Sequence, residues 1–157
     1  MKKIIFFSCA VVAVVLYACS GGAGAGSSDK DSAQNGTTKS ISDYDPHRGV
    51  GKFSNVEVGA LNETMADAGK KVYDIKCSAC HKLTDEKLVG PGWAGVTKKL
   101  NPAWIMNFIT NPDAMIDKDP ELQSQLEICL VRMPNQNLND DDARNILEFM
   151  RKNDGIK

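Results

Sequence analysis

The sequence predicts an all-α domain carried on a flexible N-terminal tether. Near the C-terminus, an apolar residue recurs at the spacing that places side chains on one face of a helix: Ala143, Ile146, Leu147 and Met150. Two further segments open with proline, which is favoured in the first turn of a helix. The sequence also lacks the alternation of strand and helix patterns that a βαβ fold requires. Together these observations favour a helical domain.

The N-terminus has the layout of a secretory signal peptide, which we expect to comprise residues 1–18. Two lysines precede an apolar run at residues 4–16. This run is shorter than the ~20 apolar residues that a membrane-spanning helix needs, although an uncleaved short anchor is the alternative. The run leads into Leu16-Tyr17-Ala18-Cys19, which resembles the lipobox of bacterial lipoproteins. The resemblance implies cleavage before Cys19, acylation of that cysteine, and an exported, periplasmic protein anchored to the inner or the outer membrane.

A flexible linker is expected at residues 19–43. This segment is rich in Gly, Ser, Asp, Lys, Thr and Asn, and it has too few apolar side chains to offset the entropy of an ordered chain. Residues 44–61 are expected to form an irregular lead-in, because proline and glycine recur in them. The apolar side chains of the lead-in are expected to pack on the domain surface: Tyr44, Phe53, Val56 and Val58.

The domain itself is expected at residues 62–157. Thr64 and Asn139 are the predicted N-caps of its first and last helices. These two helices should cross, with Gly69 allowing close approach near Phe149. Between them, helices are expected at residues 102–110 and 119–130, each with a proline near its start.

Composition restricts the kinds of partner. The chain has 157 residues, a length typical of one domain, and a formal net charge of −1. This charge gives no indication of nucleic-acid binding. A mildly acidic protein suits partners with a positive docking patch, because complementary charge steers encounter.

The residues that carry chemistry are Cys77, Cys80 and His81, in a Cys-x-x-Cys-His motif. This motif is the attachment site of c-type haem, in which two thiols form thioethers and the histidine ligates the iron. A thioredoxin-like redox pair would need a βαβ context, and a zinc site would need a further pair of ligands. Downstream of the motif, the remaining cysteine is Cys129. It lies on an apolar helical face and is read as a small buried hydrophobe, with a reactive or dimer-forming thiol as the alternative.

Met133 is the predicted sixth ligand of the iron. It is followed by Pro134 and by a polar run, a setting in which methionine is a poor core residue. Most of the other downstream methionines fall on apolar helical faces, where methionine is an ordinary packing residue. Met115, near a helix end, is less easily explained in this way. His47 is read as a solvated loop residue, unless the lead-in folds over the haem and supplies a competing ligand.

These elements together resemble a class I bacterial cytochrome c. The resemblance covers residues 62–153 and rests on motifs in the family's order: Gly69 and Tyr73, then residues 77–81, Gly90-Pro91-Gly92, Met133-Pro134 and a last helix with Phe149. It implies the cytochrome c fold, with helices wrapped around one covalently bound haem c. It also implies that the Pro91 carbonyl accepts the Nδ1–H of His81.

The same resemblance leaves several roles open. A side chain near Met133 often donates a hydrogen bond to the sulfur in this family, and the candidates are Asn135, Gln136 and Asn137. Trp93 and Trp104 would line the haem pocket, bond a propionate or pack in the core.

The expected function is transfer of single electrons between a donor and an acceptor protein at the membrane surface, without a small-molecule substrate. Two alternatives remain at this point. The first is a haem enzyme or a gas or redox sensor with an open iron site. The second is a fixed subunit of a larger respiratory complex, since residues 101–104 and 135–138 resemble segments of cytochromes that accompany bacterial anaerobic reductases.

Overall fold

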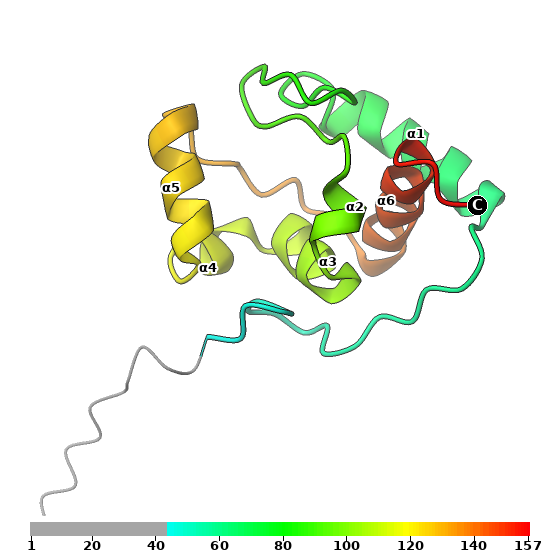
Figure 1. Cartoon of the computed structure of the whole chain (residues 1–157), viewed down its shortest axis with the longest axis horizontal. Coiled ribbons are helices and arrows are strands. Elements are labelled where there is room, and N and C mark those ends of the chain that lie inside the picture. The colour runs from blue at the N-terminus through cyan, green and yellow to red at the C-terminus, as the bar shows by residue number, and fades with distance from the viewer. Residues whose placement is uncertain (1–43) are drawn as a thin grey trace, which may run out of the picture. The chain divides into compact units, whose positions relative to one another are not determined.

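The computed structural model describes residues 44–157, and their regular elements are helices (Figure 1). The predicted all-α fold class is therefore confirmed for this part of the chain. The signal peptide, Cys19 and the linker lie outside the described residues. No helix between residues 44 and 157 has the length and apolar character needed to cross a membrane. The helices are α1 (Glu63–Lys76), α2 (Val96–Lys99), α3 (Pro102–Thr110), α4 (Pro112–Ile116), α5 (Pro120–Cys129) and α6 (Asp140–Asn153).

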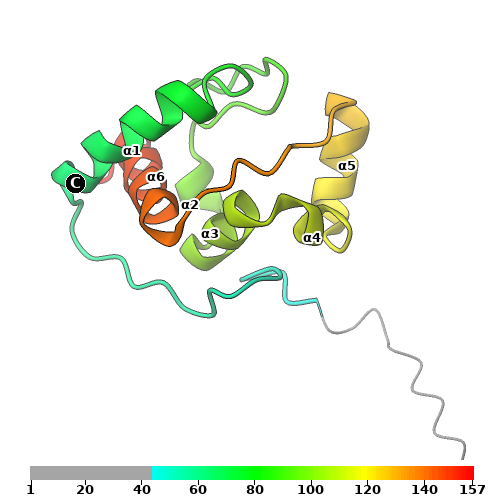
Figure 2. The same cartoon turned by 180° about the vertical axis from the view of Figure 1, so that it is seen from behind.

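Helices α1 and α6 lie against each other, as both views show (Figures 1 and 2). Gly69 makes this contact possible, because a Cβ there would lie 2.0 Å from the backbone carbonyl oxygen of Asn145. The close approach was expected near Phe149, and this detail is wrong by about one helical turn. Phe149 instead packs against Tyr73, with ring centroids 5.4 Å apart. Backbone contact needs a residue without a side chain, whereas an aromatic ring needs space.

The helix starts follow local capping chemistry. Asn139 caps α6 as predicted, with its side chain accepting from the Asp142 N–H at 2.7 Å. Thr64 does not cap α1. Asn62 does, accepting from the Met65 N–H at 3.0 Å, so α1 begins before Thr64. The short helices α2 and α4 were not expected, since neither is long enough to show a periodic pattern.

The lead-in segment, residues 44–61, is held by buried side chains of α3 and α4. Asn107, fully buried, donates to the carbonyls of Arg48 and Phe53, both at 2.8 Å, and accepts from the Phe53 N–H at 2.9 Å. Met115, also fully buried, accepts from the Val50 N–H through its sulfur at 2.9 Å. The lead-in therefore packs against the domain although it contains no helix or strand.

Helix α5 is the least buried of the longer helices. It has no buried residue, and near its end Ile128 and Leu130 remain 58% and 83% exposed. Cys129 is half-buried, so the prediction of a buried hydrophobe is wrong for this residue. Leu122, Leu126 and Cys129 of α5 border a cavity that is described below.

A buried ion cluster fixes α6 to the start of α1. Glu148 is fully buried and accepts hydrogen bonds from Arg144, from Arg151 at 2.8 Å and from the Asn62 backbone at 3.3 Å. Arg151 also donates to the Gly59 carbonyl at 2.6 Å. Burial acts to raise the pKa of the Glu148 carboxyl, but the hydrogen bonds it accepts outweigh this and hold its pKa below the ordinary value of 4.5.

We expect Glu148→Gln to lower the free energy of unfolding by about 3–5 kcal/mol at neutral pH, because it leaves the buried Arg151 charge without its partner. A lowered pKa stabilises the folded state above the unfolded pKa, and this contribution is lost as the pH falls through the folded pKa. The difference between wild type and variant should therefore shrink below about pH 4.5. Urea unfolding of the two proteins, from neutral pH to below about pH 4.5, measures this difference in the free energy of unfolding.

Glu86→Gln is the matched control, because Glu86 forms an exposed pair with Lys82. This variant should lose much less stability than Glu148→Gln at neutral pH, because exposed ion pairs contribute little to the free energy of folding. A Glu148→Gln deficit that stayed constant into strongly acidic buffer would contradict the assignment of the pH dependence to this carboxylate.

Candidate haem site

The Cys-x-x-Cys-His motif begins where α1 ends. Cys77 is the C-cap of α1, and its N–H donates to the Tyr73 carbonyl at 2.9 Å. Cys77 is buried, Cys80 is half-buried, and the two thiols are not joined in a disulfide. Burial is the main reason that the pKa of the Cys77 thiol rises to about 11. Reactive thiols of disulfide oxidoreductases have lowered pKa values, so this environment does not favour the thioredoxin-like interpretation.

His81 is held on both its backbone and its ring. The Tyr73 hydroxyl donates to the His81 carbonyl at 2.7 Å, and the His81 Nδ1–H donates to the Pro91 carbonyl at 2.8 Å. Gly90 leaves room for the ring, because a Cβ there would lie 2.5 Å from His81 Cε1. Burial lowers the pKa of His81 below its ordinary value, and the bond to Pro91 opposes this shift. A neutral ring that donates through Nδ1 keeps the Nε2 lone pair available for a metal.

The two tryptophans differ in role. Trp93 packs beside the His81 ring, with centroids 5.6 Å apart, and against Tyr73 at 5.0 Å. Trp104 donates through its indole N–H to Asp119 at 3.1 Å and to the Tyr44 hydroxyl oxygen at 3.2 Å. The Tyr44 hydroxyl donates to the same carboxylate, and burial is the main cause of its pKa rising to about 12. Trp104 therefore joins the lead-in to the start of α5.

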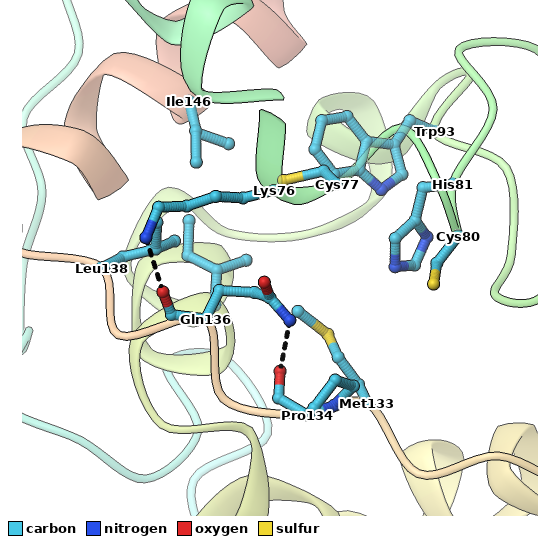
Figure 3. A pocket seen from close by; sticks show the side chains of 11 residues that line it. Lys76, Cys77, Cys80, His81, Trp93, Met133, Pro134, Gln136, Leu138 and Ile146 are labelled. Carbon is cyan, nitrogen blue, oxygen red and sulfur yellow. Dashed lines mark hydrogen bonds between the residues drawn. The ribbon is translucent and has the colours of Figure 1, made fainter. Parts of the chain in front are cut away.

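Met133 lies in the extended segment that joins α5 to α6, which Figure 2 shows passing between these helices. Its side chain and the His81 ring project into the same space from different segments (Figure 3). Cys77 and Cys80 border this space as well. The fold thus brings together the four residues that the sequence suggested as haem ligands or attachment points.

His81 and Met133 also border a larger cavity of about 650 Å³. Small-molecule and cofactor sites typically measure ~300–1,000 Å³ and have mostly apolar walls with a few polar groups. This cavity meets that description, and its donor set of one imidazole and one thioether suits haem iron. The residues therefore fit a haem group. Apolar side chains from four helices, α2, α3, α5 and α6, contribute to its wall, among them Val96, Ile105, Phe108, Ile109, Leu122 and Met150.

The other methionines are placed differently. Besides these two spaces, His81 and Met133 border a third, smaller cavity. Met106 and Met115 are buried in the core and border none of the three cavities around His81. Met150 borders the largest cavity, but Met133 accompanies His81 in all three. Met115 packs against the lead-in, and this contact accounts for a methionine near a helix end.

Sequence reasoning left several site residues undetermined. Of the polar residues after Met133, Gln136 borders a cavity with it, whereas the Asn135 side chain accepts from the Asn137 N–H at 2.8 Å. Cys129 borders a smaller cavity together with Cys80 and Met133. His47 is exposed and borders none of these cavities.

The sequence did not predict that the lead-in contributes to the wall of the cavity. Tyr44 and Pro46 border the largest cavity, together with Leu122 at the start of α5. The lead-in was expected to pack on the domain surface, and nothing in its spacing indicated contact with the haem cavity. The one indication in the sequence is that Tyr44 has a hydroxyl donor and Asp119, a helix cap, has a carboxylate that can accept from it.

Comparisons with known proteins agree with this geometry. The family described as Cytochrome c matches residues 66–154. Cytochrome c from Rhodothermus marinus is 32% identical, with a TM-score of 0.64, covering 67% of this chain and 90% of that chain. Its engineered form Rma TDE is 31% identical, with a TM-score of 0.64 and coverage of 67% and 91%. The same engineered protein bound to a carbene intermediate gives a TM-score of 0.61 at 31% identity and the same coverage.

No curated protein matches the chain in the corresponding search. The family match nevertheless spans more than half of the sequence, and the R. marinus structure is covered almost completely. The helical fold, the Cys-x-x-Cys-His motif and the cavity beside that motif agree with these matches. The chain therefore belongs to the cytochrome c family, whose members bind haem c covalently through cysteine.

Proposed function

We propose that this protein is a mono-haem class I cytochrome c that carries single electrons, with His81 and Met133 as the axial ligands. The observation that carries this proposal is that the two side chains border the same cavity, with both motif cysteines at its edge. Haem bound there supplies an iron that exchanges one electron between its ferrous and ferric forms. With both axial positions filled by the protein, no position remains for a substrate, and we propose electron transfer without enzymatic turnover.

The residues of the site have separate roles in this proposal. Cys77 and Cys80 hold the haem permanently through thioether bonds. His81 presents Nε2 to the iron, while the Pro91 carbonyl fixes the orientation of the ring. Met133 supplies a thioether sulfur, which raises the reduction potential relative to harder ligands. The apolar wall of the cavity excludes water.

We also propose that the protein is exported and tethered to a membrane through lipidated Cys19. The basic head, the apolar run and the Leu-Tyr-Ala-Cys sequence support this proposal. A tethered domain would meet its donor and acceptor at a high effective concentration. Its mildly acidic composition suits partners that present positive docking patches.

Replacing Cys77 and Cys80 together with alanine should abolish covalent haem attachment. In the wild type, the mass of the protein should exceed that of the processed polypeptide and its lipid by one haem, and haem staining should survive a denaturing gel. Cys129→Ala is the matched control and should retain the stain. Covalent haem in the double variant, or a second haem in the wild type, would contradict the proposed attachment.

Met133→Ala should remove the weak far-red absorption band of the ferric protein that indicates methionine ligation. It should also leave the iron high-spin or open to added ligands. Met115→Leu is the control, because Met115 is the methionine that the sequence left least explained, and this variant should keep the band. A high-spin wild type, or a band unchanged in Met133→Ala, would favour an open-site haem enzyme or sensor.

Cys19→Ser should abolish lipid attachment, because serine lacks the sulfur that carries the acyl chain. The wild type expressed in bacteria should incorporate labelled palmitate and sediment with membranes. The variant should not incorporate the label and should keep its haem. A wild type that sediments with membranes without incorporating label would instead indicate an uncleaved N-terminal anchor.

A further inference from the structure

Two carboxylates of α4 bind the side chain of Arg132, the residue directly before Met133. Arg132 Nε donates to Asp113 Oδ1 at 2.7 Å. Its Nη2 donates to Asp117 Oδ1 at 2.5 Å and to the Asp113 carbonyl at 3.2 Å. Asp113 lies in the first turn of α4 and Asp117 is its C-cap, so the Arg132 guanidinium contacts α4 near both of its ends.

The backbone around Met133 has little support of its own. Helix α5 ends at Cys129, its C-cap Leu130 has a φ of 59° in the left-handed region, and residues 131–138 contain no helix or strand. After Met133, the chain is held again where the Lys76 ammonium donates to the Gln136 carbonyl at 2.8 Å (Figure 3). The segment that carries Met133 is thus tied to α4 on one side and to the end of α1 on the other.

The Arg132 contacts suit positioning better than stabilisation. The Arg132 side chain is 39% exposed, and exposed ion pairs contribute little to the free energy of folding. A planar guanidinium bonded to three acceptors nevertheless fixes the position and orientation of the Arg132 side chain relative to α4, which a single flexible ammonium would not do. Helix α4 is itself anchored in the core through the fully buried Met115. Arg132 therefore connects the chain directly before Met133 to a helix that is anchored in the core.

We propose that Arg132 is a positioning residue that holds Met133 toward the iron, and that loss of its contacts with Asp113 and Asp117 makes the sixth position exchangeable. This inference rests on the proposed function, in which Met133 is the axial ligand. An external ligand binds the iron when the methionine is displaced, so its apparent affinity rises with the population of the displaced state. Freeing the chain before Met133 increases that population.

The test is a titration of the ferric, haem-loaded full-length protein with imidazole, in which binding is measured as the loss of the far-red band. Arg132→Ala should bind imidazole about tenfold more tightly than the wild type, which corresponds to ~1.4 kcal/mol. Arg132→Lys should fall between the two, because it keeps the charge without the planar fork. Asp113→Asn/Asp117→Asn should reproduce Arg132→Ala, and combining all three changes should add nothing further, as expected for one shared interaction.

Lys152→Ala is the matched control. Lys152 also pairs with two carboxylates, Glu63 at 2.7 Å and Asp67 at 3.0 Å, and its side chain is 42% exposed. It joins α6 to α1 and does not border the three cavities around His81. Its imidazole affinity should equal that of the wild type. Equal tightening in Lys152→Ala and Arg132→Ala would mean general loosening of the domain and would overturn the inference.

The outcomes separate the two proposals. If the far-red band is absent from the wild type or persists in Met133→Ala, the proposed ligation fails, and the role of Arg132 fails with it. If the band behaves as expected but Arg132→Ala and the double aspartate variant bind imidazole like the wild type, only the role of Arg132 is overturned. The double aspartate variant supplies this answer even if Arg132→Ala does not fold.

Discussion

The backbone contact between α1 and α6 at Gly69 determines how the two halves of the candidate site meet. Helix α1 ends one residue before Cys77, and α6 begins shortly after the segment that carries Met133. The crossing of these helices therefore sets the position of the attachment motif relative to the end of the segment that carries Met133. A side chain at Gly69 would force the Asn145 backbone away and alter that spacing. A close contact between two helices thus controls the geometry of the site.

Segments without regular structure depend instead on a few buried polar groups. Arg151, paired with Glu148, holds the end of the lead-in at Gly59, Asn107 holds its middle, and Asp119 holds its start through Tyr44. Asp154 acts similarly on the α2 region, accepting from the backbone and hydroxyl of Thr97. Each group is buried and has hydrogen-bond partners, which is the condition under which burying a polar group is tolerated. These contacts turn irregular chain into parts of the domain and, at Tyr44, into part of the cavity wall.

The elements that sequence reasoning placed well have strong local chemistry. Proline and an Asn or Asp cap announce α3 and α5, and a run of aspartates opens α6, because capping and the helix dipole act within a few residues. Thr64 was a reasonable cap by residue type, but Asn62 precedes it and takes that role. Cys129 lies on an apolar face that was expected to be buried. That face borders a cavity beside His81, a distinction that periodicity does not contain.

The sequence by itself determined the helical class, the covalent chemistry expected at residues 77–81 and the choice of Met133 as the leading ligand candidate. These inferences rest on contiguous residues or on local composition, for which spacing along the chain is sufficient information. Only the tertiary structure decided that Met115 belongs to the core, that Tyr44 borders the cavity and that Arg132 reaches both ends of α4. Each of these joins residues separated by many positions, and such contacts depend on how the helices pack rather than on any local pattern.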